Sequence, residues 1–283
     1  PPGSTIKPIV ALSALENDVI NPKKIIECKH YERKCSLYSP CCNNIVKCRL
    51  CHDEHELCEK KFDRFNVTKI ICDEYYPHFK TNLTKKEDIS KSLNEVINQF
   101  GIPDALINNA ALDSPPGSEE NQNGAFEDYP ELAWDKVMEV NLKSVFLCCQ
   151  IIGTEMAKNN AGSIINISSH YGVISPDQRI YEYRKKVFNK PISYSASKSG
   201  VLNITRYLST YWGERNVRVN TLTLGGVLDN QDKKFVENYS SKVPLGRMAN
   251  ESEYNGAIQF LISSASSYVT GSNMIIDGGW TAW

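Results

Sequence analysis

Two stretches decide how this chain folds. Residues 162–169 read Gly-Ser-Ile-Ile-Asn-Ile-Ser-Ser, and residues 194–198 read Tyr-Ser-Ala-Ser-Lys. The first is an apolar run ending in two hydroxyl side chains, which is typical of a buried parallel strand with polar groups at its carboxyl end. The second places a phenol and an ammonium one helical turn apart on the same face. Because a nearby ammonium lowers the pKa of a phenol from about 10, Tyr194 is a candidate acid/base near neutral pH.

Strands and helices alternate around these two stretches. Apolar strands separated by amphipathic helices indicate an α/β fold with a parallel sheet covered on both faces. We expect strands at His78–Thr81, Ala105–Asn109, Ser163–Ser168, Arg218–Leu224 and Met274–Asp277. We expect helices at Lys86–Phe100, Pro130–Lys158, Ser195–Arg215 and Ser252–Ser263. In such a sheet, ligands collect at the carboxyl ends of the strands, where Ser169 lies.

Further short motifs follow one another in this part of the chain. Asn108-Asn109-Ala110-Ala111 ends one strand, Val140-Asn141-Leu142 lies in a helix, and Asp277-Gly278-Gly279-Trp280 stands near the end. Together with the Tyr-x-x-x-Lys pair, they make residues of about 73–283 resemble the short-chain dehydrogenase/reductase family. The resemblance implies a Rossmann-like doubly wound parallel sheet and an oxidoreductase that uses NAD or NADP for hydride transfer at a secondary alcohol or carbonyl.

The resemblance also implies a role for each matching residue. Tyr194 would exchange the proton with the substrate, while Lys198 would lower the pKa of Tyr194 and hold the nicotinamide ribose. Ser169 would hydrogen-bond the substrate oxygen, and Asn141 would anchor a proton-relay water. The residues expected to contact the cofactor are Asn82, Leu83, Asn109, Ala110, Ala111, Tyr194, Lys198, Gly225 and Val227.

Substrate and assembly follow from the resemblance only in outline. The substrate would be a small-molecule alcohol or carbonyl, and the enzyme a homo-dimer or homo-tetramer. The Ser175–Arg179 insertion and the Asp277–Trp283 ending are similar to family members that act on sugars or sugar-nucleotide precursors.

Several neighbouring residues have structural interpretations. Ser168 is expected to be a structural hydroxyl at the strand end, and Asn141 has bracing of a helix kink as its alternative role. His170 lacks a nucleophile elbow and an acid partner, so we interpret it as a residue of a pocket wall or of the surface. Cys148 and Cys149 are expected to be small packing residues of a buried helix.

The amino-terminal half departs from the family pattern. Gly3 is the only glycine before Gly101, so the Gly-rich turn that cradles the pyrophosphate is absent. In the family's strand order 3-2-1-4-5-6-7, the strand at His78–Thr81 would be third, and the first two strands are not recognisable. A milder departure is Leu224-Gly225-Gly226, where the family usually has Pro-Gly. Three explanations remain: replacement strands from the amino-terminal region, a natural fusion or splice product with impaired activity, or a chain that joins segments of different origin.

A Cys/His-rich region precedes the dehydrogenase-like part. Eight of the ten cysteines lie between Cys28 and Cys72, with three histidines among them. The candidate metal ligands are Cys28, His30, Cys35, Cys41, Cys42, Cys48, Cys51, His52, His55, Cys58 and Cys72. Thiolates of a Cys-x-x-Cys pair with imidazoles suit tetrahedral zinc, and eleven ligands suffice for two ions, or for a third if another ligand joins. Metal-free structural thiols and a redox role for Cys48 and Cys51 are the alternatives.

This region resembles the CHY-type zinc finger. The resemblance rests on Cys28-x-His30-Tyr31, Cys41-Cys42, residues 48–53 (Cys-Arg-Leu-Cys-His-Asp) and Asp63-Arg64-Phe65, although the further ligands expected after Cys72 are absent. We therefore divide the chain into an extension over 1–27 with one strand within Ile6–Leu15, a small zinc-binding module over 28–72, and a dehydrogenase-like domain over 73–283. A zinc-binding interaction module fused to a catalytically impaired reductase scaffold is the alternative function.

Composition limits the remaining classes. The 283 residues are 41% hydrophobic and 23% charged, with a formal net charge of −1, which argues against a dedicated nucleic-acid binder. No uninterrupted apolar run reaches the roughly 18 residues of a membrane span, and no signal-peptide pattern opens the sequence. We expect a cytoplasmic globular protein that binds neither nucleic acid nor membranes.

Overall fold

The computed structural model describes residues 9–12, 35–38, 45–46, 70–72, 81–113, 125–184 and 188–283. The chain divides into two compact units, one of residues Pro1–Ala14 with Thr81–Trp283 and one of residues Leu15–Lys80. The strand expected within Ile6–Leu15 forms as β1 (Ile9–Leu12) and belongs to the same unit as the dehydrogenase-like residues, not to a separate extension.

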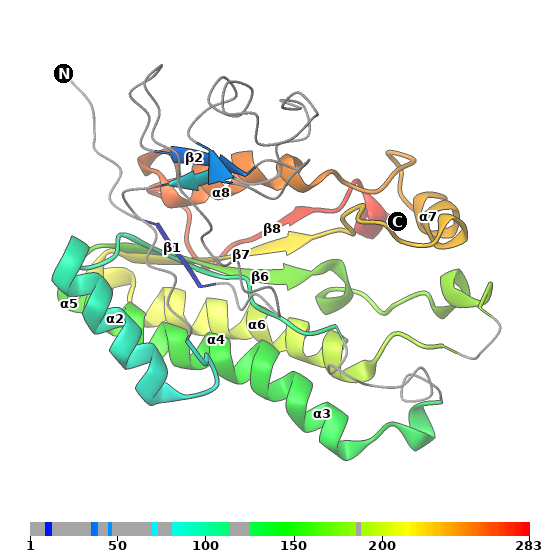
Figure 1. The fold of residues 1–283 in the computed structure, drawn as a ribbon, viewed down its shortest axis with the longest axis horizontal. Helices are drawn as coiled ribbons and strands as arrows, with labels where there is room; N and C mark the ends of the chain where they lie inside the picture. The colour runs from blue at the N-terminus through cyan, green and yellow to red at the C-terminus, as the bar shows by residue number, and fades with distance from the viewer. Residues whose placement is uncertain are drawn as a thin grey trace. The chain divides into compact units, whose positions relative to one another are not determined.

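The large unit is built on a parallel five-stranded sheet (Figure 1), in the order β1-β5-β6-β7-β8. Its strands after β1 are β5 (Ala105–Asn108), β6 (Gly162–Ser169), β7 (Val217–Leu224) and β8 (Asn273–Ile276). All four confirm expected strands to within one residue at each end. The strand expected at 78–81 lies outside the described residues except for Thr81, which is not in a strand.

The first strand of the sheet comes from the amino-terminal end of the chain. β1 runs parallel to β5, with Ile9 opposite Ala105 and Leu12 opposite Asn108. In the family's strand order, the neighbour of the fourth strand is the first strand, so β1 takes that position. The amino-terminal region therefore supplies one replacement strand.

Helices cover both faces of the sheet. One long helical run packs beside α6 (Ile192–Tyr211) and α2 (Lys86–Phe100) on one face, and α8 (Asn255–Ile262) lies on the other (Figure 1). The long run consists of α3 (Glu131–Met138), the π-helical η3 (Glu139–Lys143), α4 (Ser144–Cys148), the π-helical η4 (Cys149–Gly153) and α5 (Thr154–Lys158). It confirms the helix expected over Pro130–Lys158.

Shorter elements complete the unit. One further α-helix, α7 (Lys233–Ser240), was not predicted from the sequence. The 3₁₀ turns are η2 (Phe126–Asp128), η5 (His170–Gly172), η6 (Gln178–Tyr181), η7 (Gly213–Arg215), η8 (Glu251–Tyr254), η9 (Ser264–Ser266) and η10 (Trp280–Ala282).

The alternation of side chains along β6 explains why helices pack on both faces of the sheet. Ile164 packs with Leu106 and Val219 against the long helical run and α6. Ile165 faces the opposite way and packs with Leu222 against Leu261 of α8. Because successive strand residues point to opposite faces, each face is apolar and is buried by its own helical layer.

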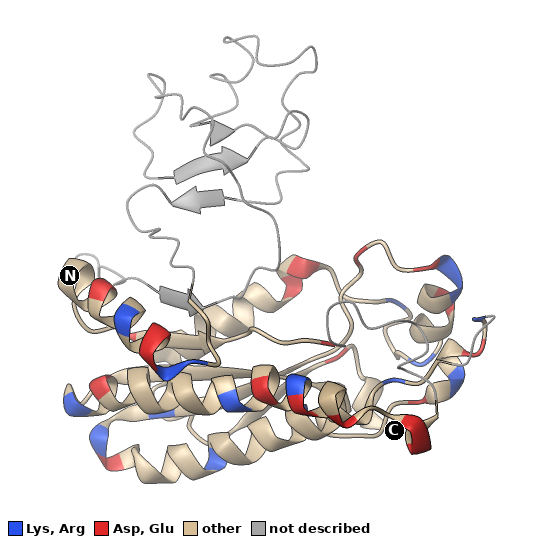
Figure 2. Ribbon diagram, turned by 60° about the horizontal axis from the view of Figure 1, so that its bottom comes forward, with Lys and Arg blue, Asp and Glu red and all other residues tan. Residues whose placement is uncertain are grey.

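The long helical run is unusually apolar. Glu131–Lys158 is long and apolar enough, by length and composition, to cross a membrane, and half of its most apolar window is buried inside the protein. Val137, Val145 and Met156 of this run are buried, two of them in the cluster that covers the sheet. We therefore interpret it as a core helix. Basic and acidic residues are interspersed along the described helices (Figure 2).

The small unit contains a three-stranded antiparallel sheet in the order β3-β2-β4. Its strands are β2 (Cys35–Tyr38), β3 (Ile45–Val46) and β4 (Ile70–Cys72). The register places Cys35 opposite Cys72, so two of the eleven candidate metal ligands stand at facing positions on neighbouring strands. The other nine lie outside the described residues.

Candidate active site

A cavity of about 510 Å³ opens at the carboxyl ends of the central strands. Ser169, the last residue of β6, and Tyr194 and Lys198, in the first two turns of α6, line it together. The residues of the wall include Asn109, Ala111, Asp113, Ile167, Ser169, His170, Tyr171, Tyr181, Tyr183, Arg184, Phe188, Lys190, Tyr194, Lys198, Leu224, Gly225, Gly226, Val227, Gln231, Asp232 and Tyr239. The sheet and α6 thus bring the three predicted reacting side chains to one place.

Burial controls the proton affinities of the Tyr-x-x-x-Lys pair. It raises the pKa of Tyr194 to about 12, while a hydrogen bond with the Ser169 hydroxyl acts in the opposite direction. Burial lowers the pKa of Lys198 to about 8. The Lys198 ammonium donates to the Ile167 carbonyl at 3.0 Å and lies 5.9 Å from the centre of the Tyr194 ring. The lowering of the Tyr194 pKa that was expected from Lys198 is therefore not seen in this structure, and Tyr194 is neutral at pH 7.

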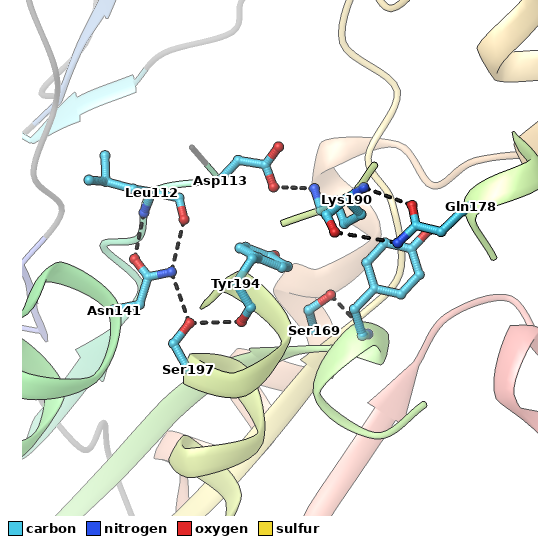
Figure 3. A network of polar contacts seen from close by, with 9 residues as sticks. Leu112, Asp113, Asn141, Ser169, Gln178, Lys190, Tyr194 and Ser197 are labelled. Atoms are coloured by element: carbon cyan, nitrogen blue, oxygen red, sulfur yellow. Dashed lines mark hydrogen bonds and ion pairs between the residues drawn. The ribbon is translucent and has the colours of Figure 1, made fainter. Parts of the chain in front are cut away.

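Asn141 lies within the π-helical segment η3, with 1% of its surface exposed. Its side chain accepts from the Leu112 backbone N–H at 2.6 Å and donates to the Leu112 carbonyl at 2.8 Å. It also donates to Ser197 Oγ at 3.1 Å, and Ser197 donates to the Tyr194 carbonyl at 2.7 Å (Figure 3). Asn141 therefore ties the loop after β5 to the first turns of α6. The structure shows this connection, whereas the water-anchoring role and the bracing of a helix kink both remain predictions.

Three other side chains have structural roles. Ser168 Oγ donates to the Lys198 carbonyl at 2.8 Å, which fixes α6 against the end of β6. Cys148 and Cys149 are buried in the core cluster of the long helical run, and burial raises the pKa of both thiols. Neutral buried thiols are poor nucleophiles, which agrees with the packing role predicted for them.

His170 forms part of the cavity wall. It is buried between the rings of Tyr171 and Trp280, whose centres lie 4.0 and 5.2 Å from its own. One ring nitrogen, Nδ1, lies 3.2 Å from the Leu224 carbonyl, and the other, Nε2, has no hydrogen-bond partner among the described residues. Burial lowers the His170 pKa to about 4, so the imidazole is neutral at pH 7.

The predicted cofactor residues divide into two groups. Asn109, Ala111, Gly225 and Val227 line the cavity with Tyr194 and Lys198. Asn82, Leu83 and Ala110 do not. The Asn82 side chain accepts from Thr84 N–H and Oγ in the turn before α2, whereas Leu83 and Ala110 pack in or against the core cluster.

The sequence interpretation missed the charged groups opposite Tyr194. Lys190 pairs with Asp113, and its Nζ lies 4.5 Å from the centre of the Tyr194 ring (Figure 3). Lys190 belongs to an insertion over Pro176–Pro191, which is recognisable in the sequence as charged. Which of its charges faces the cavity depends on how the chain returns to α6, and no periodic pattern encodes that.

Comparison with known proteins identifies the large unit. A family profile described as Enoyl-(Acyl carrier protein) reductase, of the short-chain dehydrogenase type, matches residues 59–281. The chain belongs to the short-chain dehydrogenase/reductase family. It is 35% identical over 205 residues to an NAD-dependent glycerol dehydrogenase of Listeria innocua, covering 71% of this chain and 73% of the relative. It is 34% identical over 212 residues to a 2-dehydro-3-deoxy-D-gluconate 5-dehydrogenase of Escherichia coli, covering 71% and 74%.

A solved structure gives the same result. The crystal structure of a short-chain dehydrogenase from Leptospira borgpetersenii with bound NAD⁺ matches with a TM-score of 0.63 and 37% identity, covering 71% of this chain and 74% of that chain. The family membership and the parallel α/β fold predicted from the sequence are therefore confirmed. As a member of this family, the chain is an NAD(P)-dependent oxidoreductase.

Two further profiles match the amino-terminal region. A CHY zinc finger profile matches residues 28–81, which agrees with the predicted resemblance. A penicillin binding protein transpeptidase profile matches residues 1–42, which the sequence interpretation missed. The matched stretch contains Ser4-Thr5-Ile6-Lys7, which has the Ser-x-x-Lys spacing found in such enzymes. Residues 1–8 lie outside the described residues, and no group of three or more metal-ligating side chains occurs among the described ones.

The site fits one half of a nicotinamide dinucleotide. The cavity offers Lys198 and Tyr194, with the backbone of residues 225–227, at the place where the nicotinamide and its ribose would lie. The other half needs a Gly-rich turn after the first strand, so that backbone amides can approach the pyrophosphate. The sequence after β1 begins Ser13-Ala14-Leu15 and has no glycine before Gly101. The residues present therefore fit the nicotinamide end and do not fit the pyrophosphate end.

Proposed function

We propose that this chain catalyses reversible hydride transfer at a secondary alcohol or carbonyl of a small polyhydroxylated substrate. The main support for this proposal is that Ser169, Tyr194 and Lys198 line one cavity of about 510 Å³ at the carboxyl ends of the strands. A cavity of this size accommodates a small organic molecule, and its convergent polar groups can orient one.

The chemistry assigned to the side chains follows from their positions. In the oxidative direction, Tyr194 accepts the proton of the substrate hydroxyl while Ser169 holds the same oxygen by a hydrogen bond. In the reductive direction, Tyr194 returns the proton to that oxygen. The nicotinamide, when bound, supplies or accepts the hydride at the adjacent carbon. A cationic Lys198 next to the bound ribose would favour the phenolate that oxidation requires.

The polarity of the cavity wall supports a polyhydroxylated substrate. The cavity is lined by the polar side chains of Asn109, Ser169 and Tyr183, among others. Such groups can pair with several hydroxyls of one ligand, which favours sugars and sugar alcohols over plain alkyl alcohols. Relatives carry the names glycerol dehydrogenase and sorbose reductase, and this chain is 31% identical to the latter.

A substrate panel tests the proposal. Purified chain is incubated with NAD⁺ or NADP⁺ and with sugar alcohols, aldonates and simple secondary alcohols, and formation of reduced nicotinamide is followed by absorbance. We expect turnover of polyhydroxylated compounds that requires Tyr194. Turnover of none of them in either direction, with the fold intact by circular dichroism, would refute the function.

We propose zinc binding as a second function, located in the small unit. The CHY profile match and the facing positions of Cys35 and Cys72 in the β2–β4 register support it. Because binding energy in such modules is folding energy, a strong chelator should release zinc and change the circular dichroism of the chain. Limited proteolysis should then cut within residues 28–81 while residues 125–283 stay resistant. An absence of zinc in protein purified with zinc present would contradict this proposal.

We also propose that the large unit forms a homo-dimer or homo-tetramer. Leu132, Met138, Leu142 and Phe146 of the long helical run and Ile204 of α6 line a shallow groove, and Leu132 is 83% exposed. Exposed apolar surface of this kind marks interaction sites. Sedimentation equilibrium should give a multiple of the chain mass, and Leu132→Glu should shift it towards the monomer.

A further inference from the structure

Lys190 presents a cation at the substrate side of the cavity. Its ammonium lies 4.5 Å from the centre of the Tyr194 ring and 5.9 Å from that of Tyr171, and its side chain is 13% exposed. Gln178 fixes the backbone at this position by accepting from the Lys190 N–H at 2.7 Å and donating to its carbonyl at 3.4 Å (Figure 3). The charge is therefore held next to the ring that carries the reacting hydroxyl.

A second cation shares this wall. The Arg184 guanidinium stacks over the Phe188 ring at 4.1 Å, and its Nε donates to Tyr183 Oη at 3.4 Å. All three residues line the same cavity as Lys190. Stacking on an aromatic ring orients a guanidinium while leaving its edge available for a carboxylate or phosphate.

The two acidic side chains of the cavity wall, Asp113 and Asp232, do not permanently neutralise the charges of Lys190 and Arg184. Asp232 is committed to α7, where its carboxylate accepts from the backbone N–H groups of Lys234 and Phe235. Asp113 pairs with Lys190, but its side chain is 57% exposed. An ion pair with so exposed a partner is held weakly, and the Asp113 carboxylate can return to water when another anion takes its place.

We propose that Lys190 and Arg184 bind an anionic group of the substrate, a carboxylate or a phosphate. Asp113 then occupies the anion position in the free protein. The proposal rests on the proposed function and narrows its substrate class, since the substrate must carry the anion and the reacting hydroxyl in one small molecule. Neutral sugar alcohols lack the charge that the two cations match, so they bind less tightly.

Equilibrium binding to the full chain tests this proposal without requiring turnover. Calorimetric titrations compare D-gluconate, sorbitol phosphate and neutral sorbitol, which have the same carbon number. We expect at least one of the two anions to bind about tenfold or more tightly than sorbitol, and that preference to fall about tenfold in Lys190→Met. The anion that is preferred distinguishes a carboxylate from a phosphate substrate.

Three variants separate the proposal from a general effect of charge or folding. Lys190→Arg should keep the preference. Asp113→Asn should strengthen anion binding, because it removes the competing carboxylate and leaves sorbitol binding unchanged. Arg179→Met should leave both anion binding and sorbitol binding unchanged. Arg179 is paired with Asp177 and does not line the cavity.

The outcomes distinguish this proposal from the proposed function. The Tyr194→Phe variant should retain anion binding while losing turnover. Equal binding of sorbitol and both anions, or a preference that Lys190→Met leaves intact, would overturn the anion site even if the chain oxidises sorbitol. Anion binding with no turnover of any substrate would support the site and overturn the proposed hydride transfer.

Discussion

The two sides of the cavity region differ in what the chain supplies. On the side of β6, β7 and α6, the reacting residues stand at the ends of long, buried elements, and hydrogen bonds of Lys198 join α6 to β6. On the side of β1, the chain supplies a strand in the position of the family's first strand but no glycines to follow it. The reacting centre and the pyrophosphate cradle are thus encoded by separate stretches of sequence, and one can be assembled without the other.

The reason lies in the packing of the two sides. Ser169 and Tyr194 are positioned by β6 and α6, whose cores include Ile164 and Val201 with zero exposure. In the sheet, β5 separates β6 from β1. A complete reacting centre therefore says little about the strength of cofactor binding, and the two properties need separate tests.

The largest effect is expected from removing the reacting hydroxyl. Tyr194→Phe should lower kcat by about 100- to 10,000-fold, because it removes the proton donor and acceptor while keeping the ring. Steady-state kinetics on a substrate identified in the panel measure it. Tyr207→Phe, an exposed position on the same helix, is the matched control and should retain activity. Undiminished turnover by Tyr194→Phe would show that the centre does not work through this residue.

A smaller effect, on stability, is expected when the connection between the loop after β5 and α6 is broken. Asn141→Ala should lower the free energy of unfolding by about 2–4 kcal/mol, because both backbone groups of Leu112 lose a buried partner. Urea denaturation measures it, with the exposed Gln150→Ala on the same helical run as control. If the two variants are equally stable, the Asn141 contacts do not hold the site together.

The smallest predicted effect is a change in the free energy of unfolding with pH. Burial holds the Lys198 pKa at about 8, below the 10.5 of an unperturbed lysine, so the unfolded chain binds more protons than the folded one between these values. The free energy of unfolding contributed by Lys198 should therefore rise from about pH 8 towards pH 10.5, by at most about 3 kcal/mol. Tyr194, with its pKa raised to about 12, acts in the opposite direction only above about pH 10.

Denaturation at a series of pH values from about 7.5 to about 10 checks this prediction. Lys198→Met should lack the rise that the unaltered chain shows. Lys143→Met, an exposed lysine paired with Glu139, should retain it. The same rise in Lys198→Met would assign it to another group.

The sequence predicted the parts of the fold that follow a strict hydrophobic pattern. Strands β5 to β8 and the long helical run were predicted because buried parallel strands are continuous apolar runs and the helices between them have an apolar face. The site residues Ser169, Tyr194 and Lys198 were predicted because short motifs fix their places at strand and helix ends.

The remainder depends on tertiary contacts. The strand within Ile6–Leu15 was predicted, but its pairing with β5 joins residues about 95 positions apart in the sequence, and no local pattern encodes it. Asn82 and Leu83 were assigned to the cofactor by family position, and this assignment remains a prediction. In the structure Asn82 accepts a hydrogen bond within a turn, and Leu83 belongs to the core cluster. The Asp113–Lys190 pair joins two loops whose approach depends on the whole sheet.

The difference between the two sides of the site is tested most directly by comparing the binding of the whole cofactor with that of its nicotinamide half. NADH and the reduced mononucleotide NMNH are titrated separately, and energy transfer from tryptophan to the nicotinamide is followed. Trp280, whose ring centre lies 5.2 Å from that of the wall residue His170, is a suitable donor. We expect saturable binding of both, with Kd values between about 10 µM and 1 mM that agree within about tenfold, because this chain supplies the nicotinamide end of the site. Binding of NADH about a hundredfold tighter than NMNH, or binding of neither, would contradict the division of the site into a complete and an incomplete half.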